Sequence, residues 1–175
     1  MSAGHGRAIL FVDDDLGLAK IAHRRLTRQS HRVTTVHSGE EAVRWLDCHD
    51  VDLVVLDHSL PDTSAEELVD RLKLNERVFD FIAISGQGDE QVAVSLMKRG
   101  ALDYVVKDGQ FWSRFDAAVE TALKYLDAER ELARTKKTLD AAEQRLEQVA
   151  SSICEVFWLA DTASGRFEYV SPAFE

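Results

Sequence analysis

The stretch VDLVVLD at residues 51–57 ends in an aspartate, Asp57, that directly follows a short apolar run. The stretch AILFVDDD at residues 8–15 repeats this pattern nearer the N-terminus. Near-continuous apolar runs of this length are typical of strands in a parallel sheet that is buried on both faces, and such strands end at one edge. Carboxylates that gather there repel one another unless a cation is present, and oxygen ligands of this kind suit Mg²⁺. The repeated pattern therefore predicts a metal-assisted phosphate site.

Strand-like segments alternate with helix-like segments along the first two thirds of the chain. Ser38 followed by Glu41, and Ser64 followed by Glu67, place a hydroxyl three residues before a carboxylate, which is the capping-box signature of a helix start. This alternation is typical of repeated strand–helix units that build an α/β sheet. The expected strands cover residues 8–12, 32–36, 51–56, 79–85 and 103–106.

Composition narrows the class of protein. The 175 residues, 45% hydrophobic and 30% charged, suffice for one well-buried domain and an appendage. The apolar stretches fall far short of the ~18 residues that span a bilayer, and the first residues lack a signal-peptide core, so we expect a cytoplasmic protein without membrane contact. Cys48 and Cys154 suggest neither a disulfide framework nor a zinc site. The net charge, 21 minus 31 or −10, argues against contact with nucleic acid.

Motifs at successive strand ends together resemble the receiver domain of two-component response regulators. They are the acidic triplet at 13–15, Asp57 with LPD at 60–62, Ser85 with Gly86, and YVVK at 104–107. The resemblance covers residues 7–125 and implies a doubly wound, five-stranded parallel sheet of order 2-1-3-4-5, as in flavodoxin. That order places the ends of the first and third strands side by side, where the carboxylates are already expected.

The resemblance also implies the chemistry of the site. Asp57 would be the phosphoryl acceptor, a carboxylate nucleophile that takes the group from a histidine kinase or phosphotransfer protein. Asp13 and Asp14 would form the acidic pair at Mg²⁺. Asp14, Asp57 and the backbone carbonyl of Ser59 would be direct ligands. Positioning and a cation do most of the work in phosphoryl transfer.

Two residues would stabilise the phosphoryl group, and two would form the switch. Lys107 would neutralise the phosphoryl oxygens, and Ser85 would hydrogen-bond them. Ser85 and Tyr104 would then change position together as the switch pair. The chain departs from the usual family pattern at Ser85, where threonine is commoner, and at Asp108, where proline usually follows the lysine.

Single residues at these positions also have plainer interpretations. Asp15 is expected to cap the first helix, and His58 to be a solvated loop residue beside the acceptor. The segment Gly86-Gln87-Gly88 lacks the rest of a dinucleotide fingerprint and is expected to be a loop. Tyr104 could simply pack within its strand. A flavodoxin-like cofactor binder is disfavoured, because the carboxylates would repel a flavin phosphate.

The chain changes character after the receiver-like part. Residues 110–164 contain neither glycine nor proline, and we expect one helix from Ser113 to Ala150 that extends the last receiver helix. Apolar and small residues recur every seven positions along this helix, and Glu131 and Lys136 are placed to pair between parallel helices. This pattern predicts a coiled-coil homodimer through the helix. The alternative is a solvated surface helix. The seam comprises Leu132, Leu139, Leu146 and Ile153, with Thr135, Ala142 and Val149 three residues later.

The last segment has a strand–turn–strand pattern that resembles the opening of a PAS sensor domain. We therefore expect a receiver domain at 7–125, a helical coiled-coil linker at 126–153 and the truncated start of a PAS-like domain at 154–175, in a fragment of a longer signalling protein. The expected function is that of a phosphoacceptor signalling domain, not of an enzyme with a substrate of its own. The alternative is a receiver-like dimerisation module that is not phosphorylated.

Overall fold

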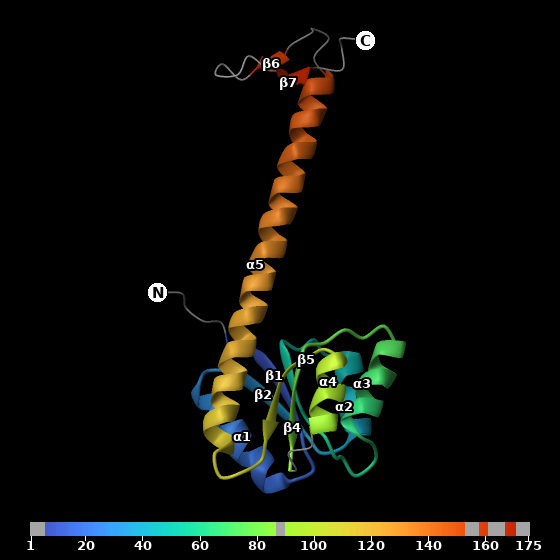
Figure 1. Ribbon diagram of the computed structural model, residues 1–175, viewed down its shortest axis with the longest axis vertical. Helices are drawn as coiled ribbons and strands as arrows, with labels where there is room; N and C mark the ends of the chain where they lie inside the picture. Colours follow the sequence, from blue (N-terminus) through green and yellow to red (C-terminus); the bar gives the residue numbers. More distant parts are fainter. Residues whose placement is uncertain (1–5, 87–89, 153–157, 161–166, 171–175) are drawn as a thin grey trace. The chain divides into compact units, whose positions relative to one another are not determined.

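The computed structural model describes residues 6–86, 90–152, 158–160 and 167–170, and side chains are described up to residue 149. Contacts within the chain divide it into two compact units, Met1–Tyr125 and Leu126–Glu175. The first unit contains five strands that alternate with helices (Figure 1). The second consists of the continuation of the last long helix and a two-stranded sheet.

The sheet of the first unit has the predicted order β2-β1-β3-β4-β5, and all its neighbouring strands are parallel. Val12 pairs with Leu56, so the ends of β1 and β3 lie side by side. This is the point in a doubly wound sheet where the connections reverse direction and ligands bind. The strands are β1 (Ala8–Val12), β2 (Arg32–Val36), β3 (Leu53–Asp57), β4 (Phe81–Ser85) and β5 (Ala101–Val106).

Helices cover both faces of this sheet, with α1 and the first part of α5 on one face and α2, α3 and α4 on the other (Figure 1). Side chains of successive residues in β1 point to the two faces of the sheet in turn. Phe11 meets Phe115 of α5 edge to face at 6.1 Å, whereas Leu10 and Val12 join the core under α2 to α4. The helices are α1 (Leu16–Arg28), α2 (Gly39–Cys48), α3 (Ala65–Leu74), α4 (Glu90–Lys98) and α5 (Phe111–Ser152).

Local hydrogen bonds explain where the helices begin. Asp15 caps α1 as expected, because its Oδ1 accepts from the amides of Gly17 and Leu18 at 2.8 and 3.0 Å. Ser64 and Glu67 form the expected capping box at α3.

The capping box expected at α2 is only half formed. Ser38 Oγ accepts from the amide of Glu41 at 3.2 Å. The Glu41 carboxylate, however, accepts from the amide of His37 at 2.7 Å, one residue before the position that a capping box uses. The Glu41 side chain therefore holds the end of β2 and not the N-cap residue.

Some element boundaries differ from those expected. β3 begins at Leu53 and not at residue 51, because the Asp52 carboxylate accepts from the amide of Ala8 at 2.7 Å and also pairs with Arg7. β4 begins at Phe81, whereas β5 begins earlier than expected, at Ala101. Gly100 precedes β5 with a φ of +93°, a conformation that glycine adopts readily after a helix.

The helix α5 runs from Phe111 to Ser152, two residues beyond the expected range at each end. Leu126 is buried, whereas the side chains of α5 from Asp127 to Val149 are exposed. Strands β6 (Trp158–Ala160) and β7 (Phe167–Val170) pair antiparallel. Ile153, Cys154 and most of the PAS-like segment lie outside the described residues. Within the described part of the chain, no helix is both long and apolar enough to cross a membrane.

Candidate functional site

Three carboxylates meet where β1 and β3 end. Asp13 and Asp57 are buried, whereas Asp14 is exposed. Each offers an oxygen that lies within 4.8 Å of the other two. The parallel register explains this proximity, since Val12 and Leu56, the residues immediately before Asp13 and Asp57, are partners. The structure thus brings together the carboxylates that the sequence placed at one edge of the sheet.

Lys107, directly after β5, reaches this cluster from across the sheet. Its Nζ lies 2.8 Å from Asp13 Oδ2 and 2.9 Å from Asp57 Oδ1. Its backbone amide donates to the carbonyl of Ser85 at 2.7 Å, which fixes the base of the side chain against β4. Burial lowers the pKa of Lys107, but the bonds to Asp13 and Asp57 outweigh burial and the pKa is raised, so the ammonium stays charged.

Asp57 is the most perturbed carboxyl of the cluster. Burial raises its pKa from 3.8 to about 6, the bond to Lys107 opposes the change, and repulsion from Asp13 and Asp14 adds to it. A cation beside Asp57 would relieve both burial and repulsion by stabilising the charged form. The contact with Lys107 alone therefore does not offset the effect of burial and of the neighbouring carboxylates on Asp57.

The cluster opens into a pocket of about 480 Å³ that can admit a hydrated cation and a phosphoryl group. The residues present fit Mg²⁺, because they supply hard oxygen ligands and Asp13 Oδ2, although ion-paired with Lys107, has no hydrogen bond of good geometry. Ser85 is buried and lines the pocket. The pocket is lined by Asp14, Asp57, His58, Ser59, Ser85, Gly86, Val92 and Lys107.

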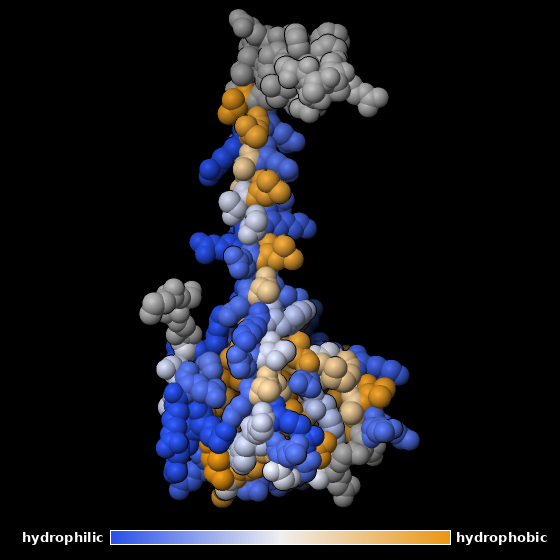
Figure 2. Space-filling view, turned by 60° about the vertical axis from the view of Figure 1, so that its left-hand side comes forward, coloured by the Kyte–Doolittle hydropathy of each residue, from blue (hydrophilic) through white to orange (hydrophobic). Residues whose placement is uncertain are grey.

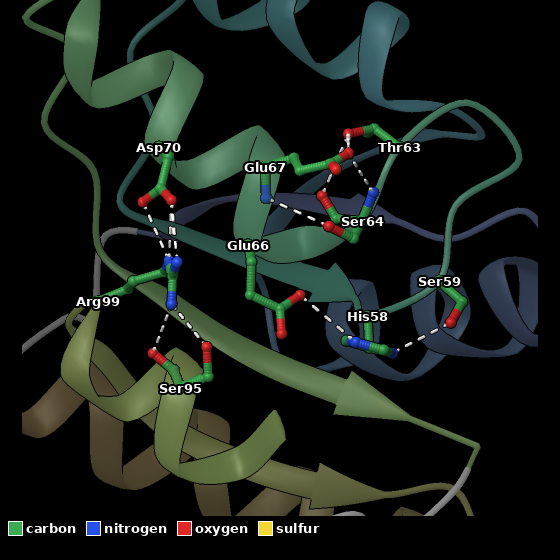
Figure 3. Close-up of polar contacts among 9 residues, drawn as sticks. All are labelled: His58, Ser59, Thr63, Ser64, Glu66, Glu67, Asp70, Ser95 and Arg99. Carbon is green, nitrogen blue, oxygen red and sulfur yellow. Dashed lines mark hydrogen bonds and ion pairs between the residues drawn. The ribbon is translucent and has the colours of Figure 1, made fainter. Parts of the chain in front are cut away.

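His58 is more constrained than a solvated loop residue. It lines the pocket, its Nδ1 lies 3.1 Å from Ser59 Oγ, and its Nε2 lies 3.4 Å from Glu66 Oε2 on α3 (Figure 3). Its side chain is 25% exposed, so the ring is partly solvated, as expected of a loop residue, and is also held by these two contacts. Only a folded α3 brings Glu66 to this ring, so no local pattern in the sequence signalled the contact.

Tyr104 is half-buried on β5 and packs against the core that lies under α2 to α4. It also lines a groove of about 260 Å³ with the first turns of α5, including Ala117 and Thr121. The side chain thus touches both the core and a surface groove. Gln87 and Gly88, expected in the loop after β4, lie outside the described residues.

Asp108 takes the place where the family usually has proline. Its carboxylate accepts from the amide of Gln110 at 2.9 Å and pairs with Arg114 on α5. The described residues contain no cis peptide bond, so the Lys107–Asp108 bond is trans. Asp108 therefore helps to start α5.

Other polar side chains, which no sequence motif marks as functional, brace the loops and helices around the pocket. Asp62, in the loop after β3, accepts from the amides of Gly39 and Glu40 at 2.8 and 2.9 Å and so caps α2 from a distance. On the far side of α3, Arg99 binds Asp70 at 3.0 Å and Ser95 Oγ at 2.6 Å, which ties the end of α4 to α3 (Figure 3). Such contacts between elements have no signature in a single sequence.

The open parallel sheet with an acidic crevice at its point of reversal defines a doubly wound α/β ligand-binding domain. More particularly, residues 9–113 match the response regulator receiver domain, and the chain belongs to that family. It is thus a signalling domain of two-component systems, a class whose members generally bind Mg²⁺ at the acidic pocket and act with a histidine kinase or phosphotransfer partner.

Individual relatives support this assignment. The methanogenesis regulatory protein FilR1 of Methanothrix harundinacea is 33% identical over 120 residues, which cover 66% of this chain and 27% of that protein. The transcriptional regulatory protein AfsQ1 of Streptomyces coelicolor is 34% identical over 103 residues, 59% of this chain and 45% of that protein. The chain therefore spans less than half the length of these relatives.

Solved structures show the same fold. The signal receiver domain of a Luxo repressor protein from Vibrio parahaemolyticus superposes with a TM-score of 0.67 at 25% identity, over 73% of this chain and 97% of that domain. NtrX from Brucella abortus superposes with a TM-score of 0.68 at 26% identity, over 83% of this chain and 35% of that protein.

The raised pKa of Asp57 predicts a pH-dependent stability in metal-free buffer. Its folded pKa of about 6 exceeds the ordinary 3.8, so the protonated carboxyl stabilises the fold fully below 3.8, and this contribution is lost as pH rises through 6. The side chain of Asp57→Asn cannot ionise, so this variant does not lose that stability as pH rises. We expect the variant to gain free energy of unfolding over the wild type on going from about pH 5 to about pH 7.5, on the order of 1–2 kcal/mol after solvent screening.

Urea unfolding of both proteins in chelator at the two pH values measures this gain. Saturating Mg²⁺ should reduce it, because a cation stabilises the ionised carboxylate of the wild type. A difference in free energy that is the same at both pH values would show that Asp57 stays ionised throughout.

Proposed function

We propose that this chain accepts a phosphoryl group on Asp57 from the phosphohistidine of a kinase or phosphotransfer protein, with Mg²⁺ in the acidic pocket. One observation carries the proposal: Asp57 lies at the pocket with Lys107 Nζ at 2.9 Å and with oxygens of Asp13 and Asp14 within 4.8 Å. A carboxylate nucleophile, a cation site and a neutralising ammonium are the components that phosphoryl transfer to aspartate needs.

In the proposed reaction a carboxylate oxygen of Asp57 forms a bond to phosphorus while the bond between phosphorus and the donor's histidine nitrogen breaks. The histidine nitrogen keeps the bonding electron pair. Asp14, Asp57 and the carbonyl of Ser59 would hold Mg²⁺, with Asp13 as the other member of the acidic pair, and the ion would neutralise phosphoryl oxygens. Lys107 would leave its ion pair with Asp57 and bind a phosphoryl oxygen, and the Ser85 hydroxyl would donate to another.

Signal output is proposed to pass through the switch pair and α5. Once Ser85 turns toward the phosphoryl group, Tyr104 can enter the space it leaves, which would repack the groove between β5 and α5. The proposal assigns the receiver to residues 7–125, a coiled-coil linker that forms a homodimer to 126–153, and the start of a PAS-like domain to 154–175. Because a kinase draws on cytoplasmic ATP, the proposal also places the chain in the cytoplasm.

The test is intact-mass analysis of the full chain after incubation with acetyl phosphate, a small donor, in Mg²⁺ or in chelator. We expect the mass of one phosphoryl group to be gained with Mg²⁺ and not with chelator. A chain that gains nothing in Mg²⁺, from the small donor or from a phosphorylated transfer protein, would support the alternative, a dimerisation module that is not phosphorylated.

Ser85→Ala should separate the chemistry from the signal. The variant retains Asp57 and Lys107 and should still become phosphorylated, but it lacks the hydroxyl that the phosphoryl group would draw inward. Hydrogen exchange in residues 90–112 and along the linker should therefore change on phosphorylation of the wild type and not of the variant. Ser95→Ala, which removes a hydroxyl from α4 that binds Arg99, is the matched control and should respond like the wild type.

A further inference from the structure

The side chain of His37, the residue after β2, contacts the backbone of the acidic pair. Its Nδ1 lies 2.9 Å from the carbonyl oxygen of Asp13. A carbonyl can only accept a hydrogen bond, so Nδ1 carries the proton and donates it. That carbonyl belongs to the planar peptide that joins Asp13 to Asp14. The imidazole therefore fixes the orientation of the one peptide plane that the two carboxylates share.

The two aspartates differ in how they are held. Asp13 is anchored by its amide, which donates to the carbonyl of Val36 at 3.1 Å, and by its Oδ1, which accepts from the amide of Asp15 at 2.9 Å. The Asp14 carboxylate is exposed and, within the described ranges, accepts no hydrogen bond. Its direction thus depends on its backbone, and the preceding peptide is held by His37.

His37 is itself held in place. Its amide donates to Glu41 Oε2 at 2.7 Å, the bond that replaces half of the expected capping box at α2. In a complete capping box this carboxylate would accept a hydrogen bond from the amide of Ser38. Departures from local sequence–structure rules tend to occur beside functional sites. This departure involves His37, which itself contacts the acidic pair.

We propose that Glu41 and His37 form a positioning relay for the cation site, in which Glu41 holds His37 and His37 holds the peptide between Asp13 and Asp14. The inference rests on the proposed magnesium site and names residues that touch neither the ion nor the phosphoryl group. Outer partners of this kind orient metal ligands, and their loss typically weakens metal affinity about 10–100-fold. The relay acts on the peptide backbone, so we expect an effect near the lower limit.

Calorimetric titration of the full chain with MgCl₂, without a phosphodonor, tests the relay. His37→Phe keeps a ring and removes the donor, and should weaken Mg²⁺ binding about ten-fold. His37→Asn places an amide nitrogen where Nδ1 lay and should recover affinity to within about two-fold of the wild type. His49→Phe is the matched control, because His49 Nδ1 lies 2.9 Å from the carbonyl of Trp45, away from the pocket, and its loss should leave affinity unchanged.

Glu41 supplies a second, independent arm. Glu41→Ala should weaken Mg²⁺ binding by less than His37→Phe does, because the imidazole remains. Glu41→Gln keeps an acceptor for the His37 amide and should bind like the wild type. This arm decides the question if His37→Phe does not fold.

Hydrogen exchange in chelator provides a readout without the metal. Exchange in residues 14–16 should be faster in His37→Phe than in the wild type, and near the wild-type rate in His37→Asn. Wild-type Mg²⁺ binding together with unchanged affinity and exchange in His37→Phe would overturn the relay and leave the proposed function intact. A wild-type chain that binds no Mg²⁺ would overturn the relay and the proposed cation site together.

Discussion

Replacing Asp57 with asparagine is expected to abolish phosphoryl gain completely, because an amide oxygen is too poor a nucleophile to displace the donor. The fold should survive the change. Asparagine has nearly the same size, and Lys107 keeps Asp13 as an ion-pair partner at 2.8 Å. Intact-mass analysis with acetyl phosphate and Mg²⁺ should show one added phosphoryl group in the wild type and none in Asp57→Asn.

Two other aspartate variants sharpen the result. Asp50→Asn changes an exposed carboxylate in the loop before β3 and should leave the phosphorylation rate unchanged. Asp14→Asn should slow the reaction at low Mg²⁺ and recover at high Mg²⁺, because it weakens the cation site and spares the nucleophile. Phosphoryl gain by Asp57→Asn at the wild-type rate would remove Asp57 from the reaction and place the acceptor elsewhere.

Strand ends could be placed from the sequence because apolar runs carry a strong local signal. The runs ILFV at residues 9–12 and LVVL at residues 53–56 are buried, so the residues that follow them lie at the sheet edge. The order of the sheet came from a resemblance, and the structure confirms it. The sequence alone therefore predicts that Asp13, Asp14 and Asp57 lie together.

Contacts between elements could not be placed in the same way. Asp62 lies in a recognisable LPD segment, but nothing in that segment says that its carboxylate would cap α2. A Cβ at position 39 would lie 2.4 Å from Thr63 Cγ2, so the close approach that this cap requires explains the glycine only once the fold is known. Glu41 was expected in a capping box, and the bend at the end of β2 redirected it to His37.

The cation site combines side chains that are placed locally with side chains that only the fold brings near. The carboxylates are supplied by strand ends and can be read from one sequence. Their orientation depends on His37 and on Lys107, which directly follow β2 and β5. Substitutions at the carboxylates should therefore affect the chemistry directly, whereas substitutions at His37 should affect only how well the site is formed.

The linker prediction rests on apolar side chains that one helix alone leaves in water. Leu132, Leu139 and Leu146 are 71%, 58% and 70% exposed and recur every seven residues along α5. Figure 2 shows apolar groups recurring along this helix between hydrophilic ones. Burying a leucine stabilises by about 1.5–3 kcal/mol, so several leucines in a seam can outweigh the entropy of association.

We therefore expect the combined variant Leu132→Ser, Leu139→Ser and Leu146→Ser to convert a dimer into a monomer in sedimentation at micromolar concentration. Serine lowers helix propensity as well as apolar area, so the matched control places serine at Ala133, Ala141 and Gln148, which lie off the seam. The control should remain dimeric. Glu131 and Lys136 flank the seam, so high salt should weaken the wild-type dimer only modestly.

Two outcomes would contradict this interface. If the leucine variant sediments as a dimer, the contact between copies lies in the receiver unit or does not involve this helix. If the off-seam control also becomes monomeric, helix propensity and not apolar packing controls association. The first result would leave Leu132, Leu139 and Leu146 as solvated residues of a surface helix, and α5 could then carry a change at Tyr104 only along its own chain and not between two copies.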